Sequence, residues 1–409
     1  MSQGVPLTDA DQERPLAWAL VSLFLAPAFI FANMYSTQAI LPVLSSAFHI
    51  SAPTAGLSVS VLVLAVAIGS LIYGPISDRI GRKPVMVSAS LLVVIPTLLL
   101  GLAPNFVTLV LLRAIQGLLM PGLTSVAISY VNEEFSGRGR GLAMGIYVSG
   151  LTLGGLFSRV GSAALTGIFD WRVALLAFTL PTLVAALCMW RFLPDIHSRK
   201  NLDRRTTLRM LPQLLANREF ARQSLSDMLL HLRNRSLIGA FIIGFSSFFG
   251  FIGIFTYLPY YLTGPHFRLS TVSLGLVYLL WLTGVCSPLA GTLAARIGSR
   301  RAIAFSMGTA ATGLLMTLIP LLPITLLGLG LMTLGMFSTV PAVNLYLGEK
   351  ATTAKGTAAS LYLSLYYFGG SLGAVLPGFA LLWGGWPGVV FLCLGVALVA
   401  LASDAVLCR

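Results

Sequence analysis

Charged residues are scarce in this sequence of 409 residues. Asp, Glu, Lys and Arg make up 10% of the chain, hydrophobic residues make up 56%, and the mean hydropathy is +0.89. A soluble chain needs about a quarter charged residues to cover its surface. The scarcity therefore excludes a soluble globular protein and predicts an outer surface that faces a lipid bilayer.

Several chemical motifs are also missing. The four cysteines are scattered singly, without metal or redox spacing. There is no G-x-x-x-x-G-K-[ST] phosphate loop of an ATP-driven pump, no H-E-x-x-H zinc motif and no serine-nucleophile context. A membrane sensor would normally carry an added soluble domain, and we find none. These absences disfavour an enzyme and a sensor, and nothing implies a bound cofactor.

Apolar runs of about 20 residues, enough to cross a bilayer, are what the sequence has instead. They predict an all-α membrane protein with twelve transmembrane helices. The predicted spans are 17–43, 54–75, 85–103, 106–130, 141–166, 171–193, 236–262, 271–294, 302–319, 322–346, 356–381 and 386–407.

The basic residues fix a predicted orientation. The formal net charge is +13, but the cations come in short bursts between apolar runs, and no nucleic-acid-binding motif accompanies them. With the N-terminus inside, all 26 Lys and Arg but Arg113, Arg159, Arg172 and Arg268 fall in cytoplasmic segments. Because basic residues favour the cytoplasmic side, both termini are predicted to be cytoplasmic in a bacterial inner membrane.

The chain divides into four predicted parts. Residues 1–16 form a cytoplasmic tail, and residues 17–193 and 236–409 form two six-helix halves. Residues 194–235 form a cytoplasmic linker, whose leucines recur at helical spacing among arginines. This spacing predicts amphipathic helices on the inner leaflet, with a solvated linker as the alternative.

The two halves repeat one another. Gly74-Pro-Ile-Ser-Asp-Arg-Ile-Gly-Arg-Lys-Pro84 follows the second span, and Gly291-Thr-Leu-Ala-Ala-Arg-Ile-Gly-Ser-Arg-Arg301 follows the eighth, at an offset of 217 residues. Leu41-Pro42 and Leu258-Pro259 match at the same offset. Two parallel halves with a long linker are one of the standard transporter plans.

These motifs make the sequence resemble the major facilitator superfamily over essentially its whole length. The G-x-x-x-D-R-x-G-R-K-P element is complete in the first half, and Arg113-Ala-Ile-Gln-Gly117 resembles the R-x-x-Q-G element of that superfamily. Within that superfamily, the sequence most resembles the bacterial drug:proton antiporters. The sequence departs from that branch because no proline stands in the glycine-rich stretch 145–155, and Ala295 replaces the motif aspartate in the second half.

The resemblance implies a latch on the cytoplasmic side. Asp78 would accept hydrogen bonds from the free N–H groups at the start of the eleventh span, near residues 354–357, where the helix dipole favours an anion. Gly81 suits a backbone with positive φ, and Gly74 would allow close helix approach. An alternative is that the charges only enforce topology. The residues assigned to the latch are Gly74, Asp78, Arg79, Gly81, Arg82, Lys83, Glu133 and Glu134.

Two arginines inside spans are the strongest indication of a solute site. Arg113 and Arg159 are equidistant from the loop near Ser136, so they should lie at similar depth. An arginine in a span needs a partner or water. Two cations facing one cavity would favour an anionic solute, whereas in the alternative interpretation backbone carbonyls satisfy each arginine. Polar and aromatic residues predicted to join the site are Asn33, Tyr35, Gln38, Gln116, Tyr257, Tyr261, Asn344, Tyr362 and Tyr366.

Coupling is harder to place, because no acid or histidine stands in the middle of a span. Proton-driven carriers usually hold one there. Coupling would therefore use an interfacial acid, with Asp78, Glu134 and Asp404 as candidates. Glycine pairs four residues apart predict close helix contacts, namely Gly141/Gly145, Gly150/Gly154 and Gly369/Gly373.

The sequence thus predicts a secondary transporter that works by alternating access on a small-molecule substrate, for which a monomer suffices. The resemblance favours export of a drug-like or amphipathic molecule by proton antiport. The two arginines favour the alternative, a carrier of small organic anions working by uniport, exchange or symport.

Overall fold

The computed structural model describes residues 9–135, 137–194, 230–351 and 355–408. Within these ranges every regular element is a helix, because backbone in lipid must satisfy its hydrogen bonds within the segment. The first group is α1 (Asp9–Tyr35), η1 (Gln38–Ile40), α2 (Leu41–Phe48), α3 (Ala52–Ile80), α4 (Arg82–Gly101), α5 (Phe106–Leu119), α6 (Pro121–Glu134), α7 (Gly137–Ile168), α8 (Trp171–Leu176) and α9 (Thr179–Phe192). The second is α12 (Arg235–Thr263), α13 (Thr271–Val277), η2 (Tyr278–Cys286), α14 (Ser287–Ile297), α15 (Ser299–Met316), α16 (Leu322–Lys350), α17 (Lys355–Gly373) and α18 (Leu376–Val406).

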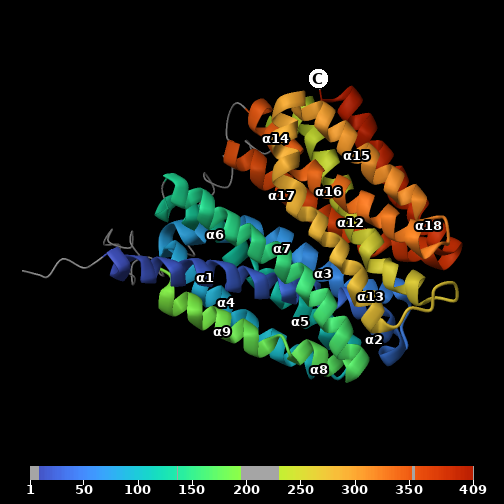
Figure 1. Cartoon of the computed structure of the whole chain (residues 1–409), viewed down its shortest axis with the longest axis horizontal. Helices are drawn as coiled ribbons and strands as arrows, with labels where there is room; N and C mark the ends of the chain where they lie inside the picture. The colour runs from blue at the N-terminus through green and yellow to red at the C-terminus, as the bar shows by residue number, and fades with distance from the viewer. Residues whose placement is uncertain (1–8, 136, 195–229, 352–354, 409) are drawn as a thin grey trace, which may run out of the picture.

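The two groups form two bundles, which meet near α2 and α13 and diverge toward α6 and α14 (Figure 1). Where they meet, α3 packs on α17 and α7 packs on α13. A Cβ at Gly56 on α3 would overlap the carbonyl oxygen of Ala374. The end around Gly56 and Ala374 is the closed end, and the end around Gly81 and Gly298 is the open end.

Helix α7 shows the divergence most directly. Near the closed end, Ala163 contacts Gly275 of α13. Gly145 lies about five helical turns away on the same face of α7, since an α-helix has 3.6 residues per turn. A Cβ at Gly145 would have nothing within 4 Å. The same face of α7 thus touches the second bundle at one end and none of the described residues at the other.

Nine helical segments of the described chain are long and apolar enough to cross a membrane. They match nine of the twelve predicted spans, from the segment at Ala17–Phe48 to the one at Leu376–Val406. The other three predicted spans coincide with α13–η2–α14, with α15 and with α17. Helix α18 is broken at Gly385, where φ is +58° and ψ is −152°, close to the predicted boundary between the last two spans.

The sequence repeat has a counterpart in the backbone. Gly81 has φ +99° between α3 and α4, and Gly298 has φ +92° between α14 and α15. Side chains with a Cβ rarely adopt this conformation, which glycine adopts freely. The predicted positive φ at Gly81 is confirmed, and its partner in the second half has the same turn.

The glycine predictions divide between the two ends. Gly150 and Gly154 lie against the backbone of α1 at Phe24 and Ala28, so that close contact is confirmed. The contacts at Gly369 and Gly373, against the backbone of α12, are confirmed as well. The close contacts predicted at Gly74, Gly141 and Gly145 are wrong for this structure, because nothing lies within 4 Å of a Cβ there. All three glycines lie toward the open end, where the bundles have separated.

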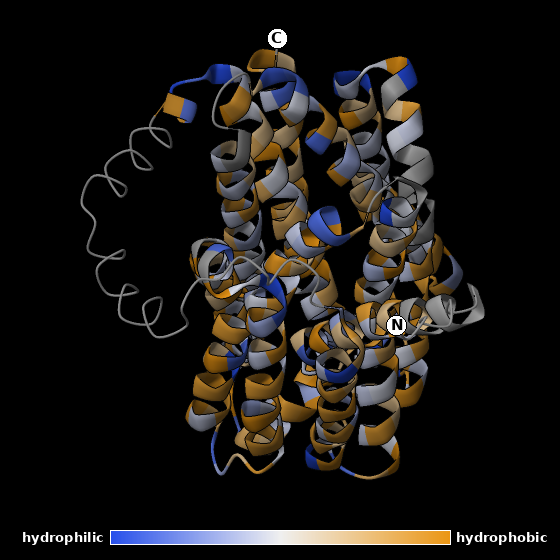
Figure 2. Cartoon of the chain, turned by 90° about the vertical axis from the view of Figure 1, so that its left-hand side faces the viewer, coloured by the Kyte–Doolittle hydropathy of each residue, from blue (hydrophilic) through white to orange (hydrophobic). Residues whose placement is uncertain are grey.

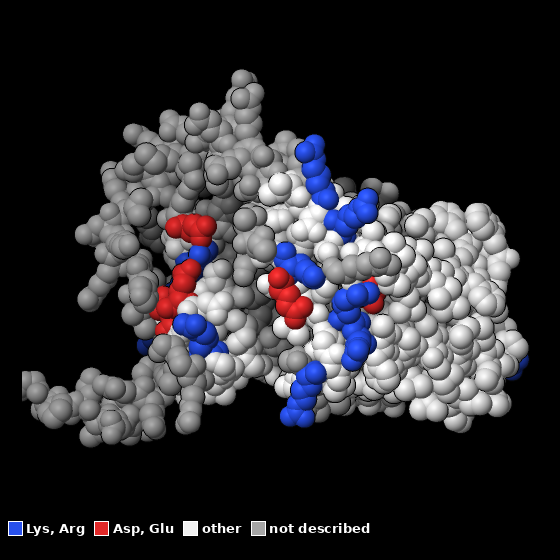
Figure 3. Space-filling view, turned by 90° about the horizontal axis from the view of Figure 1, so that it is seen from above, with Lys and Arg blue, Asp and Glu red and all other residues white. Residues whose placement is uncertain are grey.

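The surface is that of a membrane protein. Large apolar side chains stand exposed along the helices; Trp383, for example, is 86% exposed. Hydrophobic residues cover most of the helix lengths, and hydrophilic ones lie mainly at turns and helix ends (Figure 2). In the view of Figure 3 the charged side chains gather toward the open end, and the face near the closed end is almost uncharged. The amphipathic helices predicted in the linker fall on residues 195–229, outside the described residues.

Candidate functional site at the junction of the two bundles

A break in the first membrane-crossing segment organises the centre of the molecule. Helix α1 ends at Tyr35, and the chain continues through η1 into α2, where Pro42 has no N–H to donate. A helix end leaves its last carbonyls without partners, and lipid offers none. The break therefore requires donors from neighbouring helices.

Arg113 of α5 supplies those donors. Its Nη1 donates to the carbonyl oxygen of Asn33 (2.6 Å) and its Nη2 to that of Met34 (2.5 Å). These are the two residues before Tyr35, the last residue of α1. Its Nε donates to the carbonyl oxygen of Ser58 on α3 (2.8 Å). The side chain is 0% exposed. Of the two interpretations of Arg113 given above, this conformation matches the second, in which backbone carbonyls satisfy the arginine.

A small polar network surrounds this capping arginine. Gln116 accepts a bond from Arg113 (3.1 Å) and donates to Thr97 (3.0 Å). Thr97 donates to the side chain of Asn33 (3.0 Å), which also donates to Thr182 of α9 (2.8 Å). The structure thus places the predicted site residues Asn33 and Gln116 around Arg113.

Arg159 of α7 lies on the other side of the break, at the junction of the bundles. Its Nε and Nη2 both donate to Oε1 of Gln38, at 2.8 and 2.5 Å, and its Nη1 donates to the carbonyl oxygen of Gly155 (2.6 Å). The guanidinium carbon lies 3.9 Å from the ring centroid of Tyr35 and 3.6 Å from that of Trp281. Since Trp281 belongs to η2, both bundles build this site.

The positive charge at this site has no carboxylate partner. Arg159 is 0% exposed, and its hydrogen bonds go to amide and carbonyl oxygens. Ion pairs that the described residues do form, such as Arg82 with Asp78 and Glu133 and Arg300 with Asp404, lie elsewhere. A buried cation without a counter-ion is costly unless dipoles, aromatic rings or a ligand compensate it. The geometry suits an anion.

Two buried polar groups, one on Trp281 beside Arg159 and one on the turn that carries Gln38, have no hydrogen-bond partner among the described residues. The indole N–H of Trp281 is buried and unpartnered, and so is the hydroxyl of Thr37, the residue before Gln38. Buried polar groups are almost always paired, so exceptions need an explanation. Both can donate to a bound acceptor.

An aromatic wall extends from this site along α12 and α17. Trp281 contacts Phe251, with ring centroids 4.5 Å apart, and Phe248 stacks on Tyr366 at 4.1 Å. Phe248 and Phe251 are themselves stacked at 6.3 Å. Tyr366 is partly exposed. Phe248, Phe251 and Trp281 are buried in this conformation, so these ring faces are packed against one another and against Tyr366.

The remaining predicted site residues lie apart from Arg159. Tyr257 donates to the carbonyl oxygen of Ala374 (2.7 Å) at the closed end, and Tyr261 stacks on Trp386 at 4.4 Å. Tyr362 is buried against Gly244, and Asn344 is exposed on α16. Of the predicted set, the structure brings together Tyr35, Gln38 and Arg159, with Tyr366 on the adjoining wall.

Sequence reasoning missed Trp281, Phe248 and Phe251. It also missed Thr256 of α12, which accepts a hydrogen bond from Nε2 of Gln38 (2.9 Å). Tryptophan usually marks a membrane interface, so a tryptophan inside a span is the signal that could have found Trp281. The phenylalanines carry no such signal, because they are ordinary in apolar helices.

The closed end is joined by neutral groups. Ser60 of α3 and Ser371 of α17 share a hydrogen bond (2.9 Å), and Ser45 of α2 shares one with Tyr260 of α12 (2.6 Å). Each of these bonds joins the first bundle to the second, so they close the site from that side.

The open end carries the predicted latch residues. Arg82 pairs through Nη2 with Asp78 (2.5 Å) and with Glu133 of α6 (2.8 Å), and the Asp78 side chain is 60% exposed. Its predicted partner is the helix start near residues 354–357. Helix α17 begins there at Lys355, but residue 354 and the side chains at 355 and 356 lie outside the described part of the chain, and nothing is described for the Arg79 side chain. Asp78 therefore faces solvent and its own bundle in this conformation.

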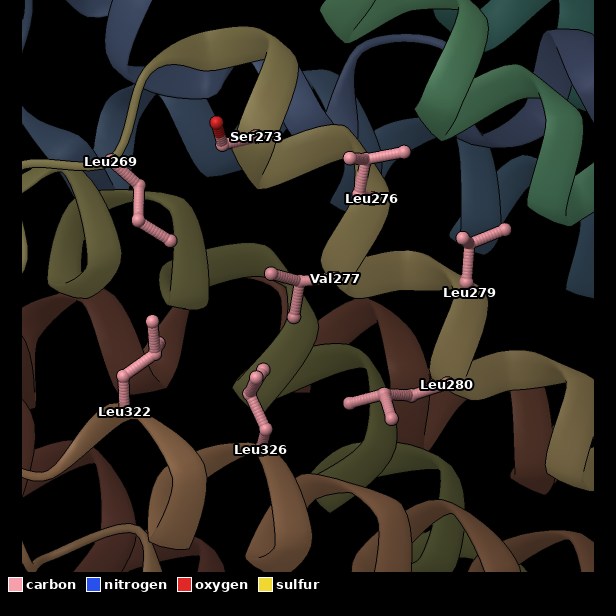
Figure 4. Close-up of a pocket in the computed structure, with 8 residues that line it drawn as sticks. All are labelled: Leu269, Ser273, Leu276, Val277, Leu279, Leu280, Leu322 and Leu326. Carbon is pink, nitrogen blue, oxygen red and sulfur yellow. The ribbon is translucent and has the colours of Figure 1, made fainter.

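Two further cavities lie away from this site. The one in Figure 4, about 370 Å³, lies between α13–η2 and the start of α16, with its side chains converging on one space. The other, about 400 Å³, lies among α12, α17 and α18. Both are lined almost wholly by apolar side chains, which offer nothing to fix a polar solute. The first is lined by Leu269, Ser273, Leu276, Val277, Leu279, Leu280, Leu322 and Leu326.

Comparison with known proteins gives consistent matches. Residues 23–374 match the sequence profile of the Major Facilitator Superfamily. The inner membrane transport protein YnfM of Escherichia coli (strain K12) is 37% identical over 90% of this chain and 85% of its own length. The uncharacterized MFS-type transporter YybF of Bacillus subtilis (strain 168) is 31% identical over 98% and 96%.

Solved structures share the fold at low identity. A bacterial homolog of the human lysosomal transporter Spinster, in an inward-facing and unoccupied conformation, superposes with a TM-score of 0.75 at 16% identity, covering 97% of both chains. A D-xylose–proton symporter superposes with a TM-score of 0.70 at 16% identity, covering 95% of this chain and 97% of its own.

Proposed function

Because this chain belongs to the major facilitator superfamily, we propose that it carries a small organic anion with an aromatic or apolar part across the bilayer by alternating access. It is a multi-pass membrane transporter and not an enzyme, because its relatives are transporters and its fold is that of transporters. The observation that carries the proposal is Arg159, a fully buried guanidinium at the junction of the bundles without a carboxylate partner.

A second buried cation supports an anionic solute. Arg113 and Arg159 both donate to the short segment between α1 and α2, Arg113 to the carbonyl oxygen of Met34 and Arg159 to the side chain of Gln38. Both add positive potential to one region of low dielectric, where charge interactions are stronger than in water. A cationic solute would meet repulsion there, and an anion attraction.

The apolar part of the solute follows from the aromatic wall. Phe248, Phe251 and Tyr366 belong to one aromatic cluster with Trp281, the ring that lies on Arg159, and they would contact the apolar part of a solute that displaces their present ring contacts. An amphipathic solute was predicted from the resemblance to drug exporters, and an amphipathic anion satisfies both the wall and the arginine.

We further propose twelve membrane-spanning helices in two halves, 17–193 and 236–409, joined by the linker 194–235, with both termini cytoplasmic. The distribution of Lys and Arg supports this orientation. The open end then faces the cytoplasm and the structure is inward-open. A monomer contains the whole site.

If transport is proton-coupled, we assign the proton to Asp404. The Asp78 side chain is largely exposed and already ion-paired. Asp404 is 6% exposed; its Oδ1 has no hydrogen bond among the described residues and lies 4.0 Å from Nε of Arg300. A proton on Asp404 would remove the charge of a buried, poorly paired carboxylate.

The function is tested with purified protein in liposomes that contain a pH-sensitive dye. Benzoate and 4-hydroxybenzoate are compared with benzamide, their uncharged analogue, and with cationic drugs. Benzamide and protonated benzoic acid cross lipid unaided, so rates are compared with protein-free liposomes. We expect the protein to speed the flux of the two carboxylates above that background and to leave the benzamide rate unchanged; additional proton movement in step with the anion, lost in Asp404→Asn, would show coupling. Proton flux driven only by cationic drugs would instead establish drug:proton antiport and refute the anion proposal.

Arg159→Lys is the sharpest variant in this assay. Lysine keeps the charge but loses the planar fork that binds a carboxylate through two parallel bonds. We expect anion flux to fall about 10–100-fold, the cost of one hydrogen bond to a charged group. Arg191→Lys, at the exposed end of α9, is the matched control and should transport normally. Equal rates for the two variants would remove Arg159 from the site.

The latch gives a separate prediction. In Asp78→Asn the anion that would meet the α17 helix start is lost, a contribution of about 0.3–2 kcal/mol. We expect transport to slow up to about 30-fold, with normal insertion and normal anion binding. Glu349→Gln, which alters an acid bonded to Ser299 within the second bundle, serves as control. Wild-type transport in Asp78→Asn would leave these charges with a topological role only.

A further inference from the structure

Gln38 occupies the face of Arg159 that a carboxylate would use. A single amide oxygen, Oε1, accepts from both Nε and Nη2, at 2.8 and 2.5 Å. These two donors form one side of the guanidinium fork, which binds carboxylates through two parallel bonds. The neutral amide oxygen therefore stands where a charged oxygen would bind more strongly.

The other end of the same amide reaches the second bundle. Nε2 of Gln38 donates to Oγ1 of Thr256 on α12 (2.9 Å), and both side chains are 0% exposed. Gln38 thus joins Arg159 of α7 to α12. Tyr260, four residues further along α12, shares a hydrogen bond with Ser45 of α2 in the first bundle (2.6 Å). The amide link therefore lies about one helical turn from a contact that joins the two bundles at the closed end.

The segment that carries Gln38 is suited to move. It lies in η1, a 3-10 turn between α1 and α2, and a short 3-10 stretch within a longer helical segment often marks a hinge. The hydroxyl of the preceding Thr37 has no partner among the described residues. Rotation of this turn would release Gln38 without unwinding either flanking helix.

We propose that Gln38 is a resident ligand of Arg159, which the carboxylate of an incoming solute displaces, and that displacement breaks the Gln38–Thr256 link between the bundles. The inference rests on the proposed anion transport. Displacement of Gln38 gives the solute a direct effect on the closed end. A ligand shifts a conformational equilibrium only by binding one state better than the other, and here the solute binds the state in which the Gln38–Thr256 link is broken. The indole N–H of Trp281, whose ring lies 3.6 Å from the Arg159 guanidinium carbon, then supplies a donor to the bound anion.

Three variants separate the two ends of the amide. Gln38→Leu removes the resident ligand, so benzoate should bind about tenfold more tightly, because it no longer competes with a bond to a charged group. Gln38→Glu places a permanent carboxylate on the fork and should abolish benzoate binding. Thr256→Val cuts only the link to α12. Because benzoate no longer has to break that link, it should bind more tightly than in the wild type, by a smaller factor than in Gln38→Leu, where the bond to Arg159 is lost as well.

The conformational measurement uses spin labels at Ala47 and His266, exposed positions on the two sides of the closed end. The labels are attached to cysteines in an otherwise cysteine-free chain. In the wild type, benzoate should shift the distance distribution toward separation. In Thr256→Val the shift should already be present without benzoate, and in Gln38→Leu benzoate should add nothing further.

The outcomes distinguish the two levels of the argument. Absence of benzoate binding in the wild type would refute anion transport itself. Binding in the wild type with unchanged affinity in Gln38→Leu, or a full benzoate-induced shift in that variant, would refute the role of Gln38 and leave anion transport standing. Monodisperse elution in size-exclusion chromatography excludes misfolding, and Thr256→Val, the mildest change, tests the link if Gln38→Leu is unstable.

Discussion

Arg113→Met should melt at a lower temperature than the wild type, whereas Arg159→Met should keep its stability and lose only transport. Methionine removes the donors to the carbonyls of Asn33, Met34 and Ser58. Ser58 lies inside α3, where its carbonyl also serves the helix, and the carbonyl of Asn33 keeps a bond from the Ser36 hydroxyl (3.1 Å), so the main loss falls on Met34. A buried carbonyl left unpaired costs about 1–3 kcal/mol, against a total stability of about 5–15 kcal/mol for a typical domain.

The comparison with Arg159 makes this prediction specific. Arg159 makes a single bond to backbone, at Gly155 four residues earlier in its own helix, where the carbonyl also serves the helix. Its other partner is a side chain that can turn away. Heating each detergent-solubilised variant and measuring the surviving monodisperse peak by fluorescence-detected size exclusion gives the result. Equal melting temperatures for the two methionine variants would contradict the capping role of Arg113.

Gly56→Val and Gly145→Val should push the transporter in opposite directions. A Cβ at Gly56 would overlap the carbonyl oxygen of Ala374 and lie 2.6 Å from the hydroxyl of Tyr257. Overpacking of this kind costs about 1–3 kcal/mol, so the closed end should open by a factor of about 5–150 in population. Transport should fall by a similar factor, because the cycle needs both ends to close in turn.

Gly145→Val is the matched partner of that variant. Its Cβ has open space in this structure, but the same face of α7 must meet the second bundle when the open end closes. The variant should therefore favour the conformation described here. Distances between spin labels across each end, measured without solute, give the two populations. A shift of the same sign in both variants would contradict the assignment of the two ends.

The sequence predicted well what depends on repeated patterns. Apolar runs located the helices, and the repeat located turns that share positive φ at Gly81 and Gly298. The small-residue faces at Gly150 and Gly154 were also readable, because only small residues allow backbones to approach so closely.

The predictions that failed or fell short depend on features without a side-chain pattern. The partners of Arg113 are mainly backbone carbonyls, which every residue has, so only the break after Tyr35 identifies them. Gly145 was assigned a close contact, and whether it has one depends on which end is closed. Gln38 was predicted to bind solute, but its bond to Arg159 joins residues 121 positions apart. Neither pairing nor conformational state follows from local sequence.

The neutral character of the closed end has a consequence for a cell whose surroundings change. Dissolved salt screens interactions between exposed charges but barely alters bonds between hydroxyl groups or contacts between methylene groups. The bonds Ser60–Ser371 and Ser45–Tyr260 should therefore hold equally well in dilute and in brackish water. In the proposed orientation this end meets the external medium, while the ion pairs of Arg82 lie on the side where the cell regulates its own ionic strength. The barrier to leakage would then be independent of external salinity.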